Sequence, residues 1–287
     1  MRRAQIVLAG CALFGAGLVA GLYVQHRWPL GRWRQHGESR PTLAPLAPQD
    51  IARLPAARRL VLVAAGQSNA ANYGEPRGAA GAGVYAFAGG RLFQAVDPLP
   101  GADGAGGSPW TRLGARLIVT GHYDAIVLAV VARGSTRASD WAPGGRRHGQ
   151  LVGTLRDLAA VGLPADYILW QQGETEGWLP EADGRGYLAV LQSLIAACRK
   201  ASPQSEFFVA QATYGSHAPS NEQIRLVQAE AAALPGAAAG PDCDTLDAGY
   251  RRDGIHFNNR GLAAVADLWL AALQPRLDRR ATREARP

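Results

Sequence analysis

Cysteine is scarce in this chain of 287 residues, which holds only three. Cys11 lies in an apolar segment near the N-terminus, whereas Cys198 and Cys243 lie in the part expected to fold. No pair has the C-x-x-C spacing of zinc and redox sites. Glu174 and Glu176 are close in sequence, but no histidine accompanies them. The sequence therefore predicts neither a metal site nor a cofactor.

Lysine is almost absent: Lys200 is the only one. The formal net charge of +7 therefore comes almost entirely from arginine. No basic stripe interleaved with aromatic residues is present, so nucleic acid is not an expected partner. The arginines are scattered along the chain, with concentrations at its two flanks, which suits solvated segments near an anionic membrane surface. These flanking residues are Arg27, Arg32, Arg34 and Arg40 on the N-terminal side and Arg279, Arg280, Arg283 and Arg286 at the C-terminus.

One long uncharged run, from Ile6 to Val24, follows Arg2 and Arg3. As a helix it would be about 28 Å long, close to the thickness of the bilayer core. Residues 1–25 are therefore expected to be a signal anchor, with a cleaved signal peptide as the alternative. Residues 26–58 are rich in Pro and Arg, which is typical of a linker. The folded domain would then face the periplasm or the exterior, either anchored in the membrane or secreted.

An oxidising compartment of that kind would make a disulfide between Cys198 and Cys243 plausible. The bond would close a loop of about 45 residues, worth ~4 kcal/mol in the chain-entropy model. The alternative is two separate buried thiols, because the sequence does not fix the distance between their Cα atoms.

Residues 59–275 alternate short apolar runs with helical patterns, and residues 276–287 are expected to form a basic tail. The runs are continuous rather than alternating, which suits strands buried on both faces of a parallel sheet. The sequence predicts a three-layer α/β/α sandwich. The expected strands are Leu60–Ala65, Val84–Ala88, Ala125–Val131, Tyr167–Trp170 and Phe207–Ala210. The expected helix faces are Leu151, Leu155 and Leu158; Leu188, Leu191 and Ile195; and Leu262, Val265, Trp269 and Leu273.

Ser68 follows the first of these strands, in the sequence Gly66-Gln67-Ser68-Asn69. Sites in parallel α/β sheets form beyond the carboxyl ends of the strands. A helix that starts there also offers free backbone N–H groups to a developing oxyanion. These features favour Ser68 as a nucleophile, and the alternative is an ordinary N-cap serine.

Asp253 and His256 lie three residues apart, just before the last predicted helix. One turn at this spacing can bring the carboxylate to the imidazole Nδ1, which leaves Nε2 to take a proton from a serine hydroxyl. The alternative is a chance occurrence of Asp-x-x-His in a loop.

Amide side chains end the strand Tyr167–Trp170, in the sequence Gln171-Gln172-Gly173-Glu174. A glutamine NH₂ can donate to an oxyanion. The alternative is a polar loop. The serine, the amides and the Asp-x-x-His motif together are far more specific than any one alone, because all are predicted at the same edge of the sheet.

Taken together, these blocks resemble those of the SGNH hydrolases, and within them the sialate O-acetylesterase-like branch that includes carbohydrate esterase family 6. The resemblance rests on Gly66–Asn69, Gln172–Glu174 and Asp253–Phe257. Ser108-Pro109-Trp110 also looks like that branch, and the match runs from about Leu60 to Leu273.

The resemblance implies a flavodoxin-like sheet of five strands and hydrolysis of acyl esters, often acetyl esters on sugars. It implies a triad of Ser68, His256 and Asp253. It also implies an oxyanion hole formed by the N–H groups of Ser68 and Gly134 and by the Gln172 side chain. The residues beside these blocks are the candidate substrate contacts: Gln67, Asn69, Trp110, Arg133 and Glu174.

One position departs from the branch, which often has Gly-Gly where this chain has Arg133-Gly134. The arginine is expected either to bind a carboxylate on the substrate or to point to solvent.

Other classes of protein fit less well. An α/β-hydrolase requires G-x-S-x-G, and Ala70 stands at its last position here. A membrane-tethered carbohydrate-binding protein without activity, an acyltransferase and a general lipase or arylesterase remain alternatives. The sequence does not specify the sugar, the acyl group or the oligomeric state.

Overall fold

A computed structural model describes residues 58–179, 183–215 and 220–284. The predicted anchor at 1–25 and the linker up to residue 57 lie outside these residues. In the described part of the chain, no helix combines the length and the apolar character needed to span a membrane.

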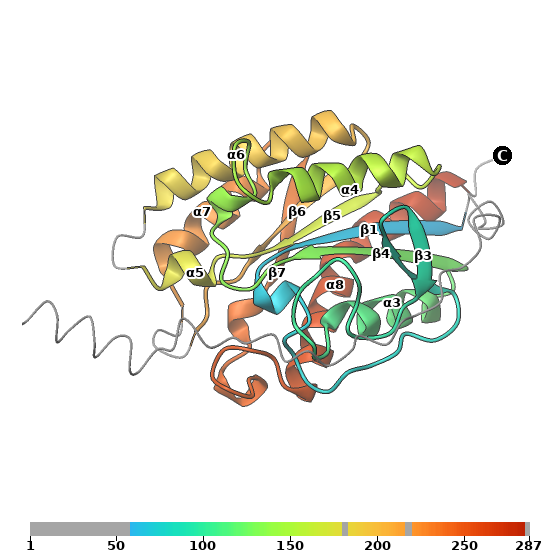
Figure 1. Ribbon diagram of the computed structural model, residues 1–287, viewed down its shortest axis with the longest axis horizontal. Coiled ribbons are helices and arrows are strands. Elements are labelled where there is room, and N and C mark those ends of the chain that lie inside the picture. Colours follow the sequence, from blue (N-terminus) through green and yellow to red (C-terminus); the bar gives the residue numbers. More distant parts are fainter. Residues whose placement is uncertain (1–57, 180–182, 216–219, 285–287) are drawn as a thin grey trace, which may run out of the picture. The chain divides into compact units, whose positions relative to one another are not determined.

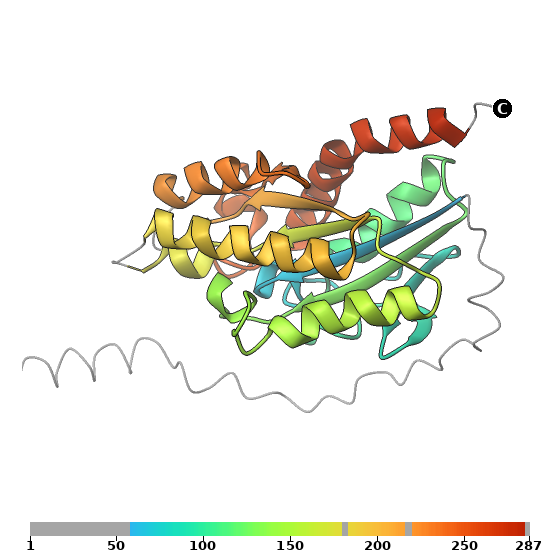
Figure 2. The ribbon, with the colours of Figure 1, turned by 90° about the horizontal axis from the view of Figure 1, so that it is seen from above.

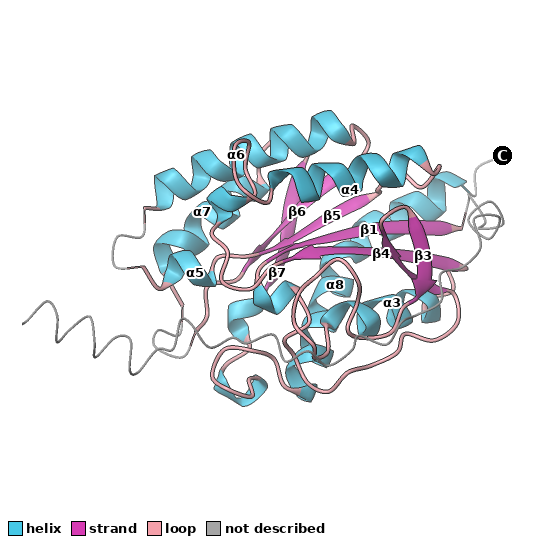
Figure 3. Ribbon diagram, in the orientation of Figure 1, coloured by secondary structure: helices cyan, strands magenta, loops and turns pink. Residues whose placement is uncertain are grey.

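A single sheet of seven strands forms the centre of the domain, in the order β3-β2-β4-β1-β5-β6-β7 (Figure 3). All neighbouring pairs are parallel except β2 and β3, which are antiparallel. The strands are β1 (Arg59–Gly66), β2 (Val84–Ala88), β3 (Arg91–Gln94), β4 (Ala125–Ala132), β5 (Tyr167–Gln171), β6 (Glu206–Gln211) and β7 (Ala237–Asp242).

The sheet is larger than the expected five strands, because β3 and β7 were not predicted. β7 reads Ala-Ala-Ala-Gly-Pro-Asp, which contains none of the β-branched or aromatic residues that strands prefer. Its Pro and Gly are tolerated because β7 is an edge strand. β3 pairs with β2 through a turn at Gly89 and Gly90, whose φ angles of 56° and 73° suit a two-residue hairpin.

Helices cover both faces of the sheet, which confirms the three-layer α/β/α prediction (Figures 1 and 2). One layer consists of α4 (His148–Ala160), α6 (Gly184–Ala201) and α7 (Glu222–Ala232). The other consists of α3 (Pro109–Val119) and α8 (Asn259–Glu284). The short helix α5 (Glu174–Gly177) follows β5 directly.

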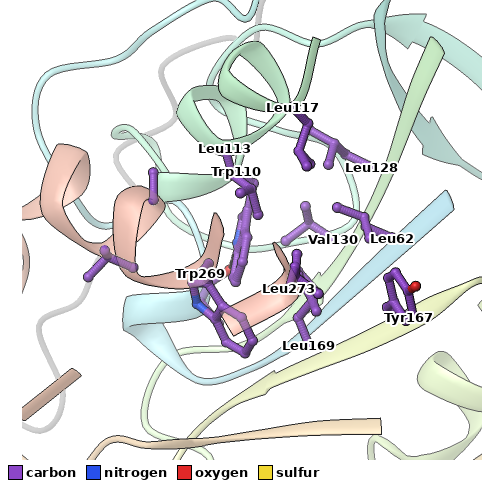
Figure 4. Close-up of a cluster of buried hydrophobic side chains, with 14 of the residues drawn as sticks. Leu62, Trp110, Leu113, Leu117, Leu128, Val130, Tyr167, Leu169, Trp269 and Leu273 are labelled. Carbon is purple, nitrogen blue, oxygen red and sulfur yellow. Dashed lines mark hydrogen bonds between the residues drawn. The ribbon is translucent and has the colours of Figure 1, made fainter. Parts of the chain in front are cut away.

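The core is divided by the sheet into two apolar clusters. Along β1, Leu60 and Leu62 face the cluster under α3 and α8, whereas Val61 and Val63 face the one under α4 and α6. This two-sided burial explains why the strand sequences are continuously apolar. The cluster under α8 includes two packed tryptophans and the apolar residues around them (Figure 4).

Helix α8 continues past residue 275, where the domain was expected to end and the basic tail to begin. Pro275 lies inside the helix, and Leu277 is fully buried. Arg276 pairs with Glu206 of β6 at 2.8 Å. The first residues expected in the tail therefore pack against the sheet.

Cys198 and Cys243 are separate buried thiols, so of the two alternatives left open by the sequence the disulfide is excluded. Cys198 lies on α6 in one apolar cluster, and Cys243 lies in the other. The sheet separates the two sulfurs, and a disulfide requires their Cα atoms to lie within about 7 Å. Burial raises the pKa of Cys198 to about 12, which is typical of an inert thiol.

Candidate active site

The carboxyl ends of three adjacent strands bring the predicted motifs together. In the parallel ladder, Gly66 at the end of β1 pairs with Ala132 of β4 and with Gln171 of β5. The residues that follow these strands therefore emerge side by side at one edge of the sheet. This edge is the candidate active site.

The turn that presents Ser68 depends on a glycine two residues earlier. Gly66 has φ +143°, and a Cβ there would lie 2.0 Å from the Gln171 carbonyl oxygen. Only glycine allows β1 to approach β5 so closely and then turn. The chain enters a short 3₁₀ helix, Ser68–Ala70, and Ser68 is 6% exposed. Within the described residues, the Ser68 N–H has no hydrogen-bond acceptor, so it can donate to an oxyanion.

Asp253 holds His256 in the arrangement expected of a catalytic pair. The His256 Nδ1 lies 2.7 Å from Asp253 Oδ2, and the His256 backbone N–H donates to Asp253 Oδ1 at 2.7 Å. Burial by itself would raise the pKa of Asp253, but the hydrogen bonds from the His256 ring and backbone outweigh it. The pKa of this carboxyl therefore lies well below its usual range, and the carboxylate stays ionised.

The serine turn and the histidine loop are joined directly, although they lie far apart in the sequence. Asn69, next to the serine, donates through Nδ2 to the carbonyl of Ile255 at 3.3 Å. The Glu75 N–H donates to the carbonyl of Phe257 at 3.1 Å. These bonds join the residues on either side of His256 to the segment that follows Ser68.

The two other predicted oxyanion donors already have acceptors. The Gly134 N–H donates to the carboxylate of Asp103 at 3.0 Å. The Gln172 amide nitrogen donates to Gln67 Oε1 at 3.1 Å and also contacts Glu176, and the side chain is fully buried. An amide nitrogen has only two protons, so in this arrangement Gln172 has none left for a substrate. Its role as an oxyanion donor stays a prediction, and its present contacts are structural.

Four of the five candidate substrate contacts are buried, which argues against contact between their side chains and a sugar. The Trp110 side chain is fully buried, donates through Nε1 to the Ala70 carbonyl at 2.7 Å and packs against Trp269. Gln67, Asn69 and Glu174 are also almost inaccessible and bond to other protein groups. Only Arg133 is partly exposed.

Comparison with protein families gives one match, to the carbohydrate esterase family described as sialic acid-specific acetylesterase, over residues 58–273. This match spans the sheet, the serine turn and the Asp-His pair.

The chain belongs to this family.

Membership makes the protein a carboxylic ester hydrolase of the acetylesterase type. No match was found among curated protein sequences. Among solved structures, an Arabidopsis thaliana protein has 19% identity and a TM-score of 0.63, covering 77% of this chain and 98% of its own. NanS has 15% identity and a TM-score of 0.56 with the same coverages. A family 3 carbohydrate esterase from Talaromyces cellulolyticus has 11% identity and a TM-score of 0.52, covering 78% and 99%. These likenesses confirm the fold.

Two residues of this acetylesterase that the sequence did not single out support its histidine loop. The Tyr73 ring stacks on the His256 ring at 5.1 Å, and its hydroxyl donates to Asp103 at 3.1 Å. Arg251 is buried and donates to the carbonyl of Ile255 at 2.9 Å. Neither residue lies in a recognisable motif, because each acts through a contact made only in the folded chain.

Proposed function

We propose that this acetylesterase removes O-acetyl groups from carbohydrates by a serine mechanism. The observation that carries the proposal is the Asp253–His256 pair, joined through Asn69 to the turn that presents Ser68. In this mechanism, the Ser68 hydroxyl attacks the ester carbonyl while the His256 Nε2 takes its proton. As the ester bond breaks, His256 gives this proton to the departing sugar oxygen, which leaves as a hydroxyl. Water then attacks the acetylated Ser68, with His256 again as base, and releases acetate.

The charges around the pair fit these roles. Asp253 stays ionised throughout, so it can orient the Nδ1–H and stabilise the imidazolium that forms during attack. The Ser68 N–H is the donor available to the oxyanion. Gly134 could add a second donor by sharing its N–H between Asp103 and the oxyanion.

Arg133 supports a narrower choice of substrate. Its backbone N–H donates to the Gly66 carbonyl at 3.0 Å, which fixes its position beside the serine turn. Its Nε is buried and has no acceptor within the described residues. Burial is the main cause of the raised pKa of the Tyr73 phenol. The positive charge of Arg133 lies close enough to oppose that rise. A guanidinium beside the serine turn suits a carboxylate on the substrate. We propose that the acetylated sugar carries one, as sialic acid does.

Acetate release tests both parts of the proposal. We expect the wild-type enzyme to deacetylate an O-acetylated sialic acid faster than its carboxamide analogue. Arg133→Gln should lower the ratio of kcat/KM for the acid to that for the amide by about 10- to 100-fold, because a charge-assisted hydrogen bond is lost. Arg156→Gln, an exposed change on α4, controls for net charge. An unchanged ratio in Arg133→Gln would exclude the carboxylate contact, and failure to release acetate from any sugar would exclude the function itself. Acyl transfer to a second sugar in place of acetate release would favour the transferase alternative.

We also propose that the domain works outside the cytoplasm, held by residues 1–25, because an uncharged run there precedes a Pro/Arg-rich linker. Full-length protein should sediment with membranes, and a chain starting at Pro41 should not. Full-length chain in the cytosol with residues 1–25 intact would contradict this location.

A further inference from the structure

Asn69 and Glu174 form a buried pair beneath the serine turn. The Asn69 Nδ2 donates to Glu174 Oε1 at 2.7 Å, and the side chains are 3% and 2% exposed. Asn69 follows the nucleophile directly, and Glu174 begins α5 at the end of β5. The pair therefore joins two of the elements that form the candidate active site.

One oxygen on each side chain is left without a partner. Asn69 Oδ1 and Glu174 Oε2 are both fully buried, and neither has a hydrogen-bond partner among the described residues. A buried acceptor without a donor costs about 1–3 kcal/mol, so two on adjacent groups require an explanation. An amide and a carboxylic acid can make two hydrogen bonds, N–H to C=O and O–H to C=O. Only the first of these is accounted for here, and a single proton on Oε2 would supply the second.

We infer that Glu174 is a protonated positioning residue whose Oε2–H donates to Asn69 Oδ1, and that this closed pair fixes the serine turn against the histidine loop. The effect of Glu174 on activity rests on the proposed function. The location of its proton can be measured whether or not the protein hydrolyses a sugar ester. Glu174 is 2% exposed and accepts a hydrogen bond from Asn69, so it acts through that residue rather than on the substrate.

The surroundings of Glu174 favour the neutral form. Burial raises the pKa of Glu174 to about 7, which the hydrogen bond from Asn69 and the charge of Arg251 only partly oppose. Asp244 raises it further, but Arg225 neutralises that carboxylate at 3.0 Å. Arg251 donates to backbone carbonyls, and its cation makes no ion pair with a described carboxylate. Among the described residues, Tyr187 and Cys243 also interact with Glu174, and burial raises the pKa of both.

The proton determines which way the Asn69 amide points. With Oε2 protonated, the amide oxygen accepts from the acid while Nδ2 donates to Glu174 Oε1 and to the Ile255 carbonyl. If Glu174 loses the proton, the amide oxygen faces a carboxylate oxygen without a donor between them. That repulsion disfavours the orientation in which Asn69 reaches Ile255, the residue before His256. Arg251 donates to the same carbonyl at 2.9 Å, so the loop would stay folded while the Ile255 carbonyl loses one of its two side-chain donors.

The pH dependence has a definite sign. Below about pH 4.5, glutamate is protonated in both the folded and the unfolded chain, so it contributes no pH dependence. Between there and about pH 7, the unfolded chain releases the proton while the folded chain retains it, so wild-type stability falls as pH rises. A glutamine at this position cannot ionise, yet its amide can make both hydrogen bonds to Asn69. The Tm of Glu174→Gln relative to wild type should therefore increase from pH 5 to pH 8.

The experiment compares Glu174→Gln with Glu174→Ala, and Glu230→Gln on the exposed side of α7 serves as the charge control. We expect Glu174→Ala to lose about 10- to 100-fold in kcat through misplacement of the serine and histidine. Glu174→Gln should retain most of the kcat that Glu174→Ala loses, and its Tm relative to wild type should rise from pH 5 to pH 8. In wild type, ionisation of Glu174 should lower kcat above neutral pH, and this decline should be absent in Glu174→Gln. The infrared carbonyl band of a protonated buried carboxyl should be present in wild type at pH 6 and absent in Glu174→Gln.

The inference would be overturned if Glu174→Gln lost as much kcat as Glu174→Ala, or if its Tm fell below wild type at pH 8. Either result would mean that an ionised Glu174 stabilises Arg251. Absence of the carboxyl band at pH 6 would also overturn it. The Tm and infrared measurements decide the question even if the chain hydrolyses no sugar ester, so failure of the proposed function would be recognised separately.

Discussion

Replacing Ser68 with alanine is expected to lower kcat for acetyl-ester hydrolysis by a factor on the order of 10⁴–10⁶. His256→Ala should have an effect of similar size, because the serine cannot be activated without a base next to it. Triad members act as a unit, so the double variant should be little worse than either single variant. Initial rates of acetate release from one O-acetylated sugar, with each variant at saturating substrate, measure these effects.

Ser139→Ala is the matched control, because Ser139 is exposed and lies in the 3₁₀ turn after β4. It should retain wild-type kcat. All of these variants should keep the wild-type circular dichroism spectrum. Near-normal hydrolysis by a correctly folded Ser68→Ala protein would remove Ser68 from the mechanism.

Gly66→Ala is expected to destabilise the fold by roughly 3–5 kcal/mol, at the upper end of what single substitutions cost. The new Cβ would lie 2.0 Å from the Gln171 carbonyl oxygen, and the backbone has φ +143°, where only glycine is unstrained. Relief of the clash requires β1 and β5 to separate at the point where the serine turn begins. Urea unfolding measures the loss of stability, and kcat should fall as well because Ser68 moves.

Gly81→Ala separates the two causes of this loss. Gly81 also has a positive φ, +87°, but a Cβ there meets nothing within 4 Å. Its substitution should cost only the backbone strain, about 1–2 kcal/mol. Equal losses of unfolding free energy in Gly66→Ala and Gly81→Ala would show that the close approach of β1 to β5 is not the reason why position 66 requires glycine.

Much of this architecture could be predicted from the sequence, because buried parallel strands have a distinctive composition. The continuous apolar runs of β1 and β4 predicted both strands, and the carboxyl end of β1 predicted the sheet edge at which Ser68 lies. The candidate role of Gly134 came only from the family resemblance. β7 could not be predicted, because its Ala-Ala-Ala-Gly-Pro-Asp sequence becomes a strand only through pairing with β6. Tertiary context overrides weak local preference there.

The positions of the site residues were more predictable than the directions of their side chains. Placing Gln67, Asn69 and Glu174 at the sheet edge was sufficient to suggest contact with substrate. In the structure these side chains turn inward and bond to one another or to neighbouring backbone. Trp110 is similar, because α3 places its indole under Ala70 rather than in the open edge. A one-dimensional pattern carries no information about such rotations.

The Asp-x-x-His motif was informative because its geometry is local. Three residues of spacing allow a single turn to close, and the observed Nδ1–Oδ2 distance is 2.7 Å. The supporting contacts of His256 with Tyr73 and of Ile255 with Arg251 join distant segments, so they became visible only in the fold. The sequence left the Cys198–Cys243 disulfide open for a related reason, because it does not reveal which face of the sheet each residue occupies.

The most direct test of the central claim is to treat the enzyme with a fluorophosphonate and locate the adduct by peptide mass spectrometry. Such reagents phosphonylate an activated serine and leave ordinary hydroxyls unmodified. If His256 activates Ser68, we expect one adduct, on the peptide that contains Ser68, and a parallel loss of acetate release. Neither Ser68→Ala nor His256→Ala should be labelled. An adduct on another serine, or full esterase activity after complete labelling of Ser68, would contradict the assignment.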